Sequence, residues 1–404
     1  MDRRVSVTIL TRKEFLRLGG LALVTTSLSA CGQLGVPFGE SEPPAPATPA
    51  QNAPSGGNIG NGPIHVALIL PLTSQSGASQ IGVSMRNAAE LALSDSGSSE
   101  LTILVKDDRS SPDGARQAAQ EALNDGAQLF IGPLFAANVR EVSSVAHGAG
   151  KSVIAFSTDP TVAAPGTYLL SFPIDGKVNR VLDFAASRGK KSFAVLAPDA
   201  GASPASLAAF AAFQSHAGDI GVRVQSVERY PAGKPGDAVK RVATVAQQID
   251  GIFIADDANG MGAMATALTA NGLDGRKIQL LGTDAWEDPR TMALPALQGA
   301  WFAAPDDAGF RNFAQRYRAK YNSEPHRLAS LAYDATSLAA ALPRVQSANP
   351  YTDAVLTDSK GFTNVDGFFR FRTNGQVERA LAVYQIGNGS KSILDAAPRS
   401  LPVT

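Results

Sequence analysis

The chain has 404 residues, of which 44% are apolar and 18% are charged. That composition is typical of a folded protein, and the length exceeds what one hydrophobic core usually organises, so two domains are expected. Lysine plus arginine and aspartate plus glutamate both total 36, which argues against a net field that would attract nucleic acid. The single cysteine excludes an internal disulfide and a multi-cysteine metal site.

Residues 1–31 have the pattern of a lipoprotein signal peptide. A basic stretch up to Arg17 is followed by a mostly apolar run over residues 18–30, which is too short for the roughly 20 residues of a membrane-spanning helix. Leu28-Ser29-Ala30-Cys31 resembles the bacterial lipobox, which implies a lipidated Cys31 and membrane attachment without a spanning segment. Residues 11–17 also resemble a relaxed twin-arginine signal, so the export route stays open between that pathway and the general one.

Residues 32–62 are rich in proline, alanine, glycine and serine and poor in large apolar side chains. We interpret this segment as a flexible tether. Its glycines do not follow a strand, so a phosphate-binding loop is not expected there.

After the tether, short aliphatic runs alternate with longer alanine-rich stretches, the pattern of βαβ units on a mainly parallel sheet. The predicted strands are Ile64–Leu70, Leu101–Lys106, Gln128–Ile131, Ser152–Ala155, Ser192–Ala197, Val222–Glu228, Gly251–Ile254 and Ile278–Leu281. Apolar residues at spacings of three and four predict helices that include Ile81–Leu93, Asp113–Asn124, Val178–Ser187, Pro204–His216, Gly236–Gln247 and Gly260–Ala270.

The βα pattern occurs in two successive runs, so we expect an α/β fold with two Rossmann-like lobes. Two further helices, Gly309–Tyr321 and Arg327–Leu342, follow without a strand of their own and are expected to return to the first lobe. An Asn-Gly turn lies between the predicted strands Gly367–Arg372 and Ala380–Ile386, which are expected to form a hairpin of the second lobe. The predicted organisation is therefore residues 64–176 plus 305–360 for lobe 1 and 177–304 plus 361–395 for lobe 2, joined by a hinge of several strands.

Ligands of open α/β sheets bind outside the carboxyl ends of the strands, so function is expected in the loops that follow strands. Four such loops carry glycine, serine or threonine after an apolar run. They are Pro71–Ser79, Gly132–Asn138, Phe156–Pro160 and Thr283–Asp288.

The stretch HVALILPLTSQSGASQIGVSMRNAAELAL resembles the opening of type I periplasmic binding proteins of the leucine/isoleucine/valine kind. The later stretches FIGPLFAANV, SVIAFSTDP, SLAYDA and GFFRFRTNGQVERALAVYQI resemble further landmarks of that family, in the same order. The resemblance covers nearly all of residues 64–390. It implies a non-catalytic receptor outside the cytoplasm that carries an amino acid or related solute to an ABC permease without a cofactor or metal.

The resemblance also implies binding residues in the first lobe. The family holds a ligand carboxylate with a serine and backbone amides after the third strand, a position that falls near Ala136, which has no hydroxyl. A threonine after the fourth strand corresponds to Thr158, beside Ser157. The alternative for Ser157 and Thr158 is that they cap the turn after a strand, as short polar residues do in many proteins.

In the second lobe, the family's acidic residue for the ligand ammonium corresponds to Asp284. Trp286 follows closely, and a carboxylate with an aromatic ring suits a cationic or ring-bearing ligand. Asp257, next to Asp256, lies where amino-acid binders tend to carry an aromatic residue. These departures leave the identity of the ligand open.

A second group with this fold, the penicillin-binding-protein activators, consists of lipid-anchored proteins that contact a peptidoglycan synthase. The lipobox, the long tether and the altered ligand position resemble that group, so a cell-wall synthase is an alternative partner. A hydrolytic enzyme is disfavoured, because no GxSxG, HExxH or GxxxxGK[ST] pattern occurs. Asp334 lies in the middle of an apolar helical stretch, and we interpret it as structural because a buried carboxylate needs partners.

Overall fold

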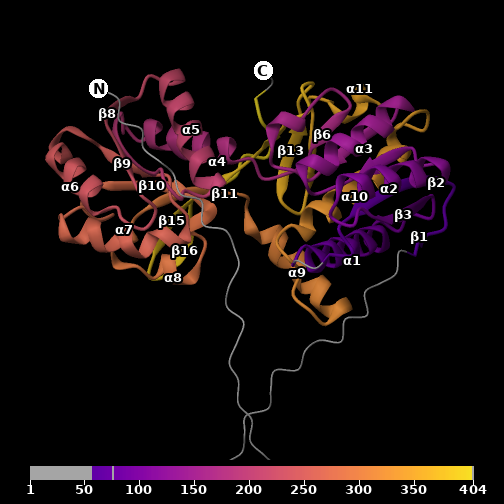
Figure 1. Cartoon of the computed structure of the whole chain (residues 1–404), viewed down its shortest axis with the longest axis horizontal. Coiled ribbons are helices and arrows are strands. Elements are labelled where there is room, and N and C mark those ends of the chain that lie inside the picture. The colour runs from indigo at the N-terminus through magenta and orange to yellow at the C-terminus, as the bar shows by residue number, and fades with distance from the viewer. Residues whose placement is uncertain (1–56, 75–76, 403–404) are drawn as a thin grey trace, which may run out of the picture. The chain divides into compact units, whose positions relative to one another are not determined.

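The computed structural model describes residues 57–74 and 77–402, all of which belong to one compact unit. It contains two large β-sheets with helices on both faces of each, together with one small sheet. Figure 1 shows the two α/β lobes built around the two large sheets, which confirms the predicted fold class. The signal peptide, Cys31 and the tether up to residue 56 lie outside the described residues.

The first lobe contains a six-stranded sheet in the order β1-β3-β2-β4-β5-β6, parallel except for β1. Its strands are β1 (Ile59–Gly60), β2 (Ile64–Leu70), β3 (Leu101–Asp107), β4 (Leu129–Ile131), β5 (Ser152–Ala155) and β6 (Thr167–Leu169). Its helices are α1 (Ala78–Ser96), α2 (Pro112–Asn124), α3 (Ala136–Gly148), the 3₁₀ turn η1 (Pro160–Val162), α9 (Asp307–Tyr321), α10 (Ala329–Val345) and α11 (Asp353–Leu356).

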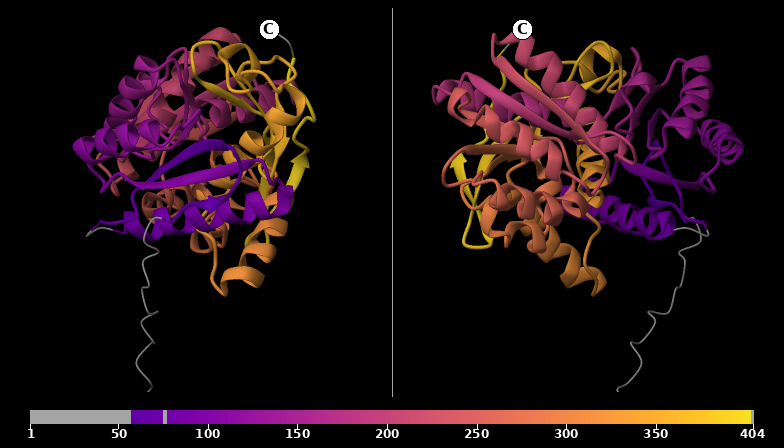
Figure 2. Two further views of the ribbon diagram at one scale, coloured as in Figure 1. Left: turned by 90° about the vertical axis from the view of Figure 1, so that its right-hand side faces the viewer. Right: turned by 60° about the vertical axis from the view of Figure 1, so that its left-hand side comes forward.

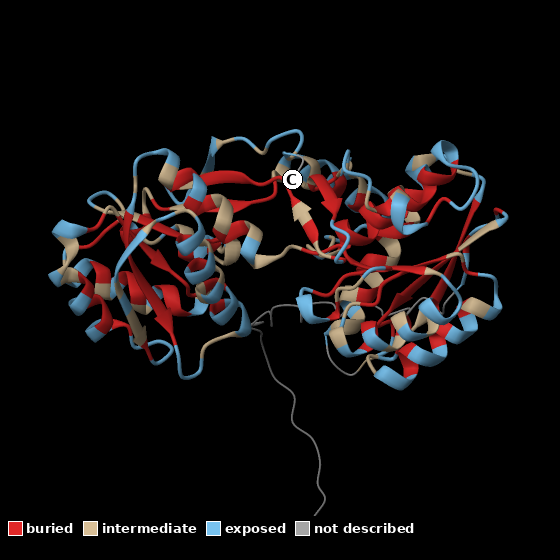
Figure 3. Ribbon diagram, turned by 90° about the horizontal axis from the view of Figure 1, so that it is seen from above, coloured by how far each residue is buried: buried red, intermediate tan, exposed pale blue. Residues whose placement is uncertain are grey.

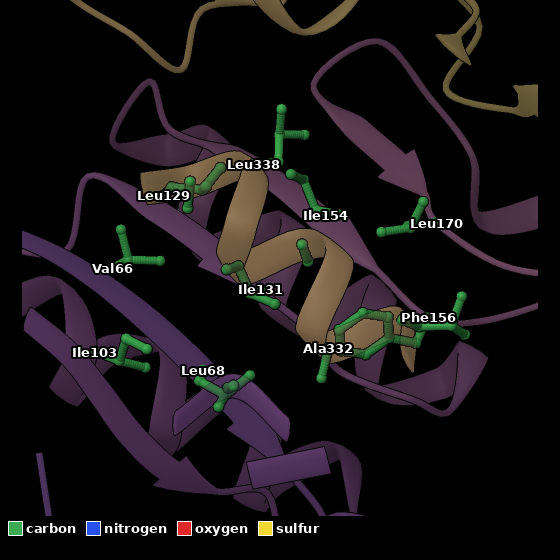
Figure 4. Close-up of a cluster of buried hydrophobic side chains, with 14 of the residues drawn as sticks. Val66, Leu68, Ile103, Leu129, Ile131, Ile154, Phe156, Leu170, Ala332 and Leu338 are labelled. Atoms are coloured by element: carbon green, nitrogen blue, oxygen red, sulfur yellow. The ribbon is translucent and has the colours of Figure 1, made fainter. Parts of the chain in front are cut away.

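Alternate residues of the first sheet serve two separate cores. Val66, Leu68 and Ile131 face α1 and α10, and Figure 4 shows α10 lying across these strands. Ala67 and Phe130 face the opposite side, where they pack against α2 and α3. Both faces are therefore covered, which explains why the strands are continuous apolar runs in the sequence.

The second lobe contains a seven-stranded sheet in the order β16-β15-β11-β10-β9-β7-β8. Its strands are β7 (Ser192–Pro198), β8 (Arg223–Tyr230), β9 (Gly251–Ile254), β10 (Gln279–Thr283), β11 (Trp301–Ala304), β15 (Ala382–Gly387) and β16 (Ser390–Asp395). One face carries α4 (Ile174–Ser187) and α5 (Pro204–Asp219), and the other carries α6 (Gly236–Thr244), α7 (Ala258–Ala270) and α8 (Pro289–Met292). The 3₁₀ turns are η2 (Ala246–Gln248), η3 (Asp284–Trp286) and η4 (Pro295–Leu297). Figure 3 shows the strands of both large sheets as mostly buried, with the exposed residues concentrated on helices and loops.

The C-terminal segment differs from the predicted hairpin. Gly367–Phe371 (β13) pairs with Phe362–Asn364 (β12) and Val377–Arg379 (β14) in the small sheet, and its Phe369 and Phe371 pack in the core of lobe 1. β15 instead pairs with β11 and β16 of lobe 2. Assigning all of residues 361–395 to lobe 2 was therefore wrong, because the aromatic face of β13 is buried against lobe 1.

The predicted tether also ends earlier than residue 62. β1 pairs antiparallel with β3, and Ile59 is buried in the lobe 1 core. A Cβ atom at Gly62 would overlap the backbone of Glu100, and one at Gly60 would overlap the backbone of Leu101. These glycines are needed for close packing onto β3, so the flexible assignment was wrong for this end of the segment.

The chain passes between the two lobes three times. The crossings are residues 170–173 between β6 and α4, residues 305–306 between β11 and α9, and residues 380–381 between β14 and β15. Figure 2 shows from two further sides that α9, which follows the second crossing, lies near α1 of lobe 1. Lys320 of α9 and Glu90 of α1 form an ion pair of 3.1 Å across that contact. Among the described helices, none is long and apolar enough to cross a membrane.

Candidate functional site

The carboxyl ends of the parallel strands carry most of the residues predicted to bind a ligand. In lobe 1 these are the loops after β4 and β5, and in lobe 2 the loops after β9 and β10. The loop after β2, predicted to span Pro71–Ser79, includes two residues outside the described part and runs into α1, which begins at Ala78.

The first-lobe residues lie at the start of α3 and just after β5. Ala136 is the first residue of α3, and the preceding Phe135 gives this helix no side-chain cap. The first backbone N–H groups of α3 are therefore not satisfied by a capping side chain. Ser157 is buried and its Oγ accepts a hydrogen bond from the N–H of Asp159 at 3.1 Å, whereas Thr158 is exposed. Ser157 thus stabilises the turn, and Thr158 is the hydroxyl that a ligand could reach.

Asp284 already has a cationic partner within the chain. It begins η3, directly after β10, and its carboxylate lies 2.7 Å from the ammonium of Lys177 in the first turn of α4. The Lys177 side chain is 8% exposed and that of Asp284 is 27% exposed. The helix dipole disfavours a cation in a first turn, so the carboxylate stabilises a lysine that its own helix does not.

Lys177 was not identified from the sequence. A signal was present, because residue 177 shares the apolar face of α4 with Ile174 and Val178. A lysine on an apolar helix face needs a partner, but the periodicity cannot say which one.

Trp286 does not face a ligand. It is completely buried in the core of lobe 2, and its indole N–H donates to the carbonyl oxygen of Asp256 at 3.1 Å. The ring also lies against Gly282, where a Cβ atom would overlap it. The predicted role of this ring in ligand binding was therefore wrong, because Trp286 is part of the hydrophobic core of lobe 2.

The two neighbouring acids Asp256 and Asp257 make different structural contacts. Asp256 is buried, accepts a hydrogen bond from the Tyr230 hydroxyl at 2.8 Å, and has a pKa raised by burial. Asp257 is the N-cap of α7 and accepts from the N–H of Asn259 at 3.0 Å. A cavity of about 10 Å³ beside them is no larger than one water molecule requires.

A cluster of cations surrounds Phe172 on the first crossing. The guanidinium carbon of Arg327 lies 4.4 Å from the Phe172 ring centre, that of Arg379 lies 4.8 Å away, and the ammonium of Lys177 lies 5.9 Å away. Arg379 also donates from Nε to the carbonyl oxygen of Ser171 at 2.6 Å. Phe172 therefore links Lys177 to Arg327, which follows the second crossing, and to Arg379, which precedes the third.

A larger cavity of about 510 Å³ lies elsewhere, at the amino end of β5. In its wall the Ser152 hydroxyl donates to the carbonyl oxygen of Tyr351 at 2.9 Å, and the Asp353 carboxylate lies 3.3 Å from the same hydroxyl. The bond to Tyr351 holds the segment before α11 against β5. Within the described part of the chain, no three potential metal-ligating side chains lie together.

The comparisons with known proteins agree with this architecture. The sequence profile of a family described as "Periplasmic binding protein" matches residues 63–391. No curated protein matches the sequence significantly.

Solved structures resemble the fold at low sequence identity. A structure named for a branched-chain amino acid ABC transporter of Rhodospirillum rubrum has a TM-score of 0.73 and 19% identity, covering 82% of this chain and 99% of its own. A substrate-binding protein of Desulfitobacterium hafniense in complex with Leu has a TM-score of 0.58 and 20% identity, covering 82% and 99%. A solute-binding protein of Rhodopseudomonas palustris in complex with 3,4-dihydroxy benzoic acid has a TM-score of 0.56 and 19% identity, covering 83% and 98%. Because the profile covers most of the chain and the two-lobed fold matches, this chain belongs to the periplasmic binding protein family.

Proposed function

We propose that this chain is a non-catalytic receptor that binds a small solute outside the cytoplasm and delivers it to an ABC permease. The observation that carries the proposal is the family match over residues 63–391, combined with two sheets whose carboxyl-end loops belong to lobes joined by three crossings. A family defined by periplasmic solute binding implies a location outside the cytoplasm.

The class of ligand is narrower than the family as a whole. Structures of this fold hold Leu in the Desulfitobacterium hafniense protein and 3,4-dihydroxy benzoic acid in the Rhodopseudomonas palustris protein. Both molecules are small carboxylic acids. We propose that the ligand of this chain is also an amino acid or a related small acid, held by Thr158 and the start of α3 on one side and by the loops after β9 and β10 on the other.

We further propose that the protein is anchored to a bacterial membrane through a lipidated Cys31. The support is the lipobox-like sequence and the proline- and alanine-rich segment that follows it. Several acyl chains on one residue suffice for stable attachment.

A thermal-shift screen tests the receptor function. A ligand that binds only the native state raises the melting temperature, by the equivalent of about 2.7 kcal/mol at a hundredfold excess over its Kd. We expect at least one member of a library of amino acids, oxo acids and aromatic acids to raise it. If the whole library leaves it unchanged, the receptor proposal fails, and crosslinking to a cell-wall synthase tests the alternative partner.

A further inference from the structure

We infer that Lys177 neutralises Asp284, the carboxylate that the family resemblance assigns to a ligand ammonium, and thereby excludes α-amino acids, so that the solute received here is a carboxylic acid without an ammonium group. This inference rests on the proposed receptor function and assigns the substrate class of the same site. Lys177 is the specificity-determining residue in it.

The ion pair is built into the lobe and not loosely attached to its surface. Lys177 extends from α4 at a point where Val178 and Val181 are fully buried in the core, so the start of the side chain is fixed. Its ammonium meets Asp284 at 2.7 Å, with the Phe172 ring 5.9 Å away. Because the Lys177 side chain is buried and that of Asp284 is half-buried, the pair is harder to separate than a surface ion pair.

The neighbouring carboxylates of lobe 2 also have partners. Asp256 holds the Tyr230 hydroxyl, and Asp257 caps α7. Glu287 pairs with Lys391 at 2.9 Å and Asp288 with Arg290 at 3.0 Å. Asp284, the predicted partner of a ligand ammonium, is thus paired with Lys177, and the acids beside it already form hydrogen bonds or ion pairs within the protein.

An α-amino acid would have to displace Lys177 from Asp284. The lysine ammonium would then remain buried without a counter-ion. Because leaving one partner of a buried pair uncompensated is costly, we expect the affinity for an α-amino acid to be reduced by a hundredfold or more. A carboxylic acid with no ammonium avoids this penalty. It still finds the exposed Thr158 hydroxyl and the uncapped N–H groups at the start of α3, near Ala136, as hydrogen-bond donors.

The test compares two ligands that share a carbon skeleton. L-leucine and 4-methyl-2-oxopentanoate differ only in an ammonium-bearing carbon against a carbonyl. Calorimetric titration of the full chain is expected to show the oxo acid binding at least a hundredfold more tightly than leucine. Lys177→Met, which frees Asp284 while keeping most of the apolar side chain, is expected to bind leucine at least tenfold more tightly than the wild type does. Lys240→Met, at an exposed lysine of α6, is the matched control and is expected to change neither affinity.

The outcomes separate this inference from the receptor proposal. Leucine binding by the wild type that equals or exceeds binding of the oxo acid overturns the inference, and this ratio needs no variant that must fold. Failure of folded Lys177→Met to gain leucine binding also overturns it. If the wild type binds nothing in the broad screen, the receptor proposal fails and the inference that rests on it fails too. A wild type that binds leucine as tightly as the oxo acid leaves the receptor proposal intact and overturns the inference alone. The double variant Lys177→Met with Asp284→Asn removes both charges, so the gained leucine affinity is expected to disappear in it.

Discussion

Asp334 is a buried carboxyl group that makes a hydrogen bond to a distant segment of the chain. It lies in the middle of α10, is completely buried, and accepts a hydrogen bond through Oδ1 from the N–H of Val365 at 3.0 Å. Burial and the nearby Asp366 raise the pKa of Asp334 to about 8, while Arg379 opposes this increase. The structural role predicted for this residue agrees with its burial and its bond to the segment that precedes β13.

The raised pKa gives stability a pH dependence that Asp334→Asn is expected to remove. Between the usual pKa of 3.8 and the raised one, the folded state binds more protons than the unfolded state. Wild-type stability contributed by this group is therefore fully present below the usual pKa and is lost as pH rises through the raised value, by at most about 1.4 kcal/mol per pH unit. Asparagine keeps an acceptor for Val365 and cannot titrate.

Urea unfolding of the wild type and the variant from pH 4 to pH 8 measures this effect. We expect the stability of the wild type relative to Asp334→Asn to decrease steadily with pH. A constant difference across that range would mean that Asp334 keeps the same charge in the folded and unfolded chains.

Among the helices, α7 contains two glycines whose surroundings differ. Gly260 and Gly262 both lie in this helix. A Cβ atom at Gly260 would overlap the carboxylate of Asp256, whereas one at Gly262 would meet nothing within 4 Å. Close approach of the helix to the end of β9 therefore requires only the first glycine.

Alanine substitutions at the two positions are expected to act in opposite directions. Gly262→Ala should stabilise the protein by about 0.5–1 kcal/mol, because alanine loses less backbone entropy in a helix. Gly260→Ala should destabilise it, because the methyl group displaces Asp256 from the Tyr230 hydroxyl. Denaturant midpoints of the two variants provide the comparison, and equal effects of the two substitutions would contradict this account of α7.

The strands show which elements a sequence can specify. β2, β5 and β9 have the predicted bounds, because a strand covered on both faces is a continuous apolar run. β11 was missed although Trp301–Ala304 is apolar, since a run of that length does not distinguish a strand from a helical segment. Trp301–Ala304 is a strand because it pairs with β10 and β15, and this pairing cannot be read from the segment itself.

At the scale of the whole molecule, three crossings join the lobes, and contacts near them are shared. Arg379, the last residue of β14 in the small sheet, donates from Nε to the carbonyl oxygen of Ser171 on the first crossing. Tyr384 of β15 donates to the carbonyl oxygen of Pro305 on the remaining crossing at 3.2 Å. A hinge of three crossing segments restricts the lobes to a limited set of movements, which suits a protein that closes on a solute.

Cys31 determines where the whole molecule resides, if the lipobox-like sequence acts as proposed. Replacing it with serine removes the thiol that would carry the acyl chain. We expect the variant to lose the membrane-bound fraction and the added acyl mass, as measured by fractionation and mass spectrometry, while the folded part keeps its melting temperature. An unchanged mass and membrane fraction would rule out lipidation at this residue.

The two α/β lobes, the family and the position of the loops that follow the strands were predictable from the sequence, because buried strands and amphipathic helices are local patterns. Which of those loop residues are available to a ligand became clear from the three-dimensional contacts. The tertiary structure placed Trp286 in the core, paired Asp284 with Lys177, and assigned β13 to lobe 1. Each of these depends on residues far apart in the chain meeting in space, and local periodicity carries no information about such partners.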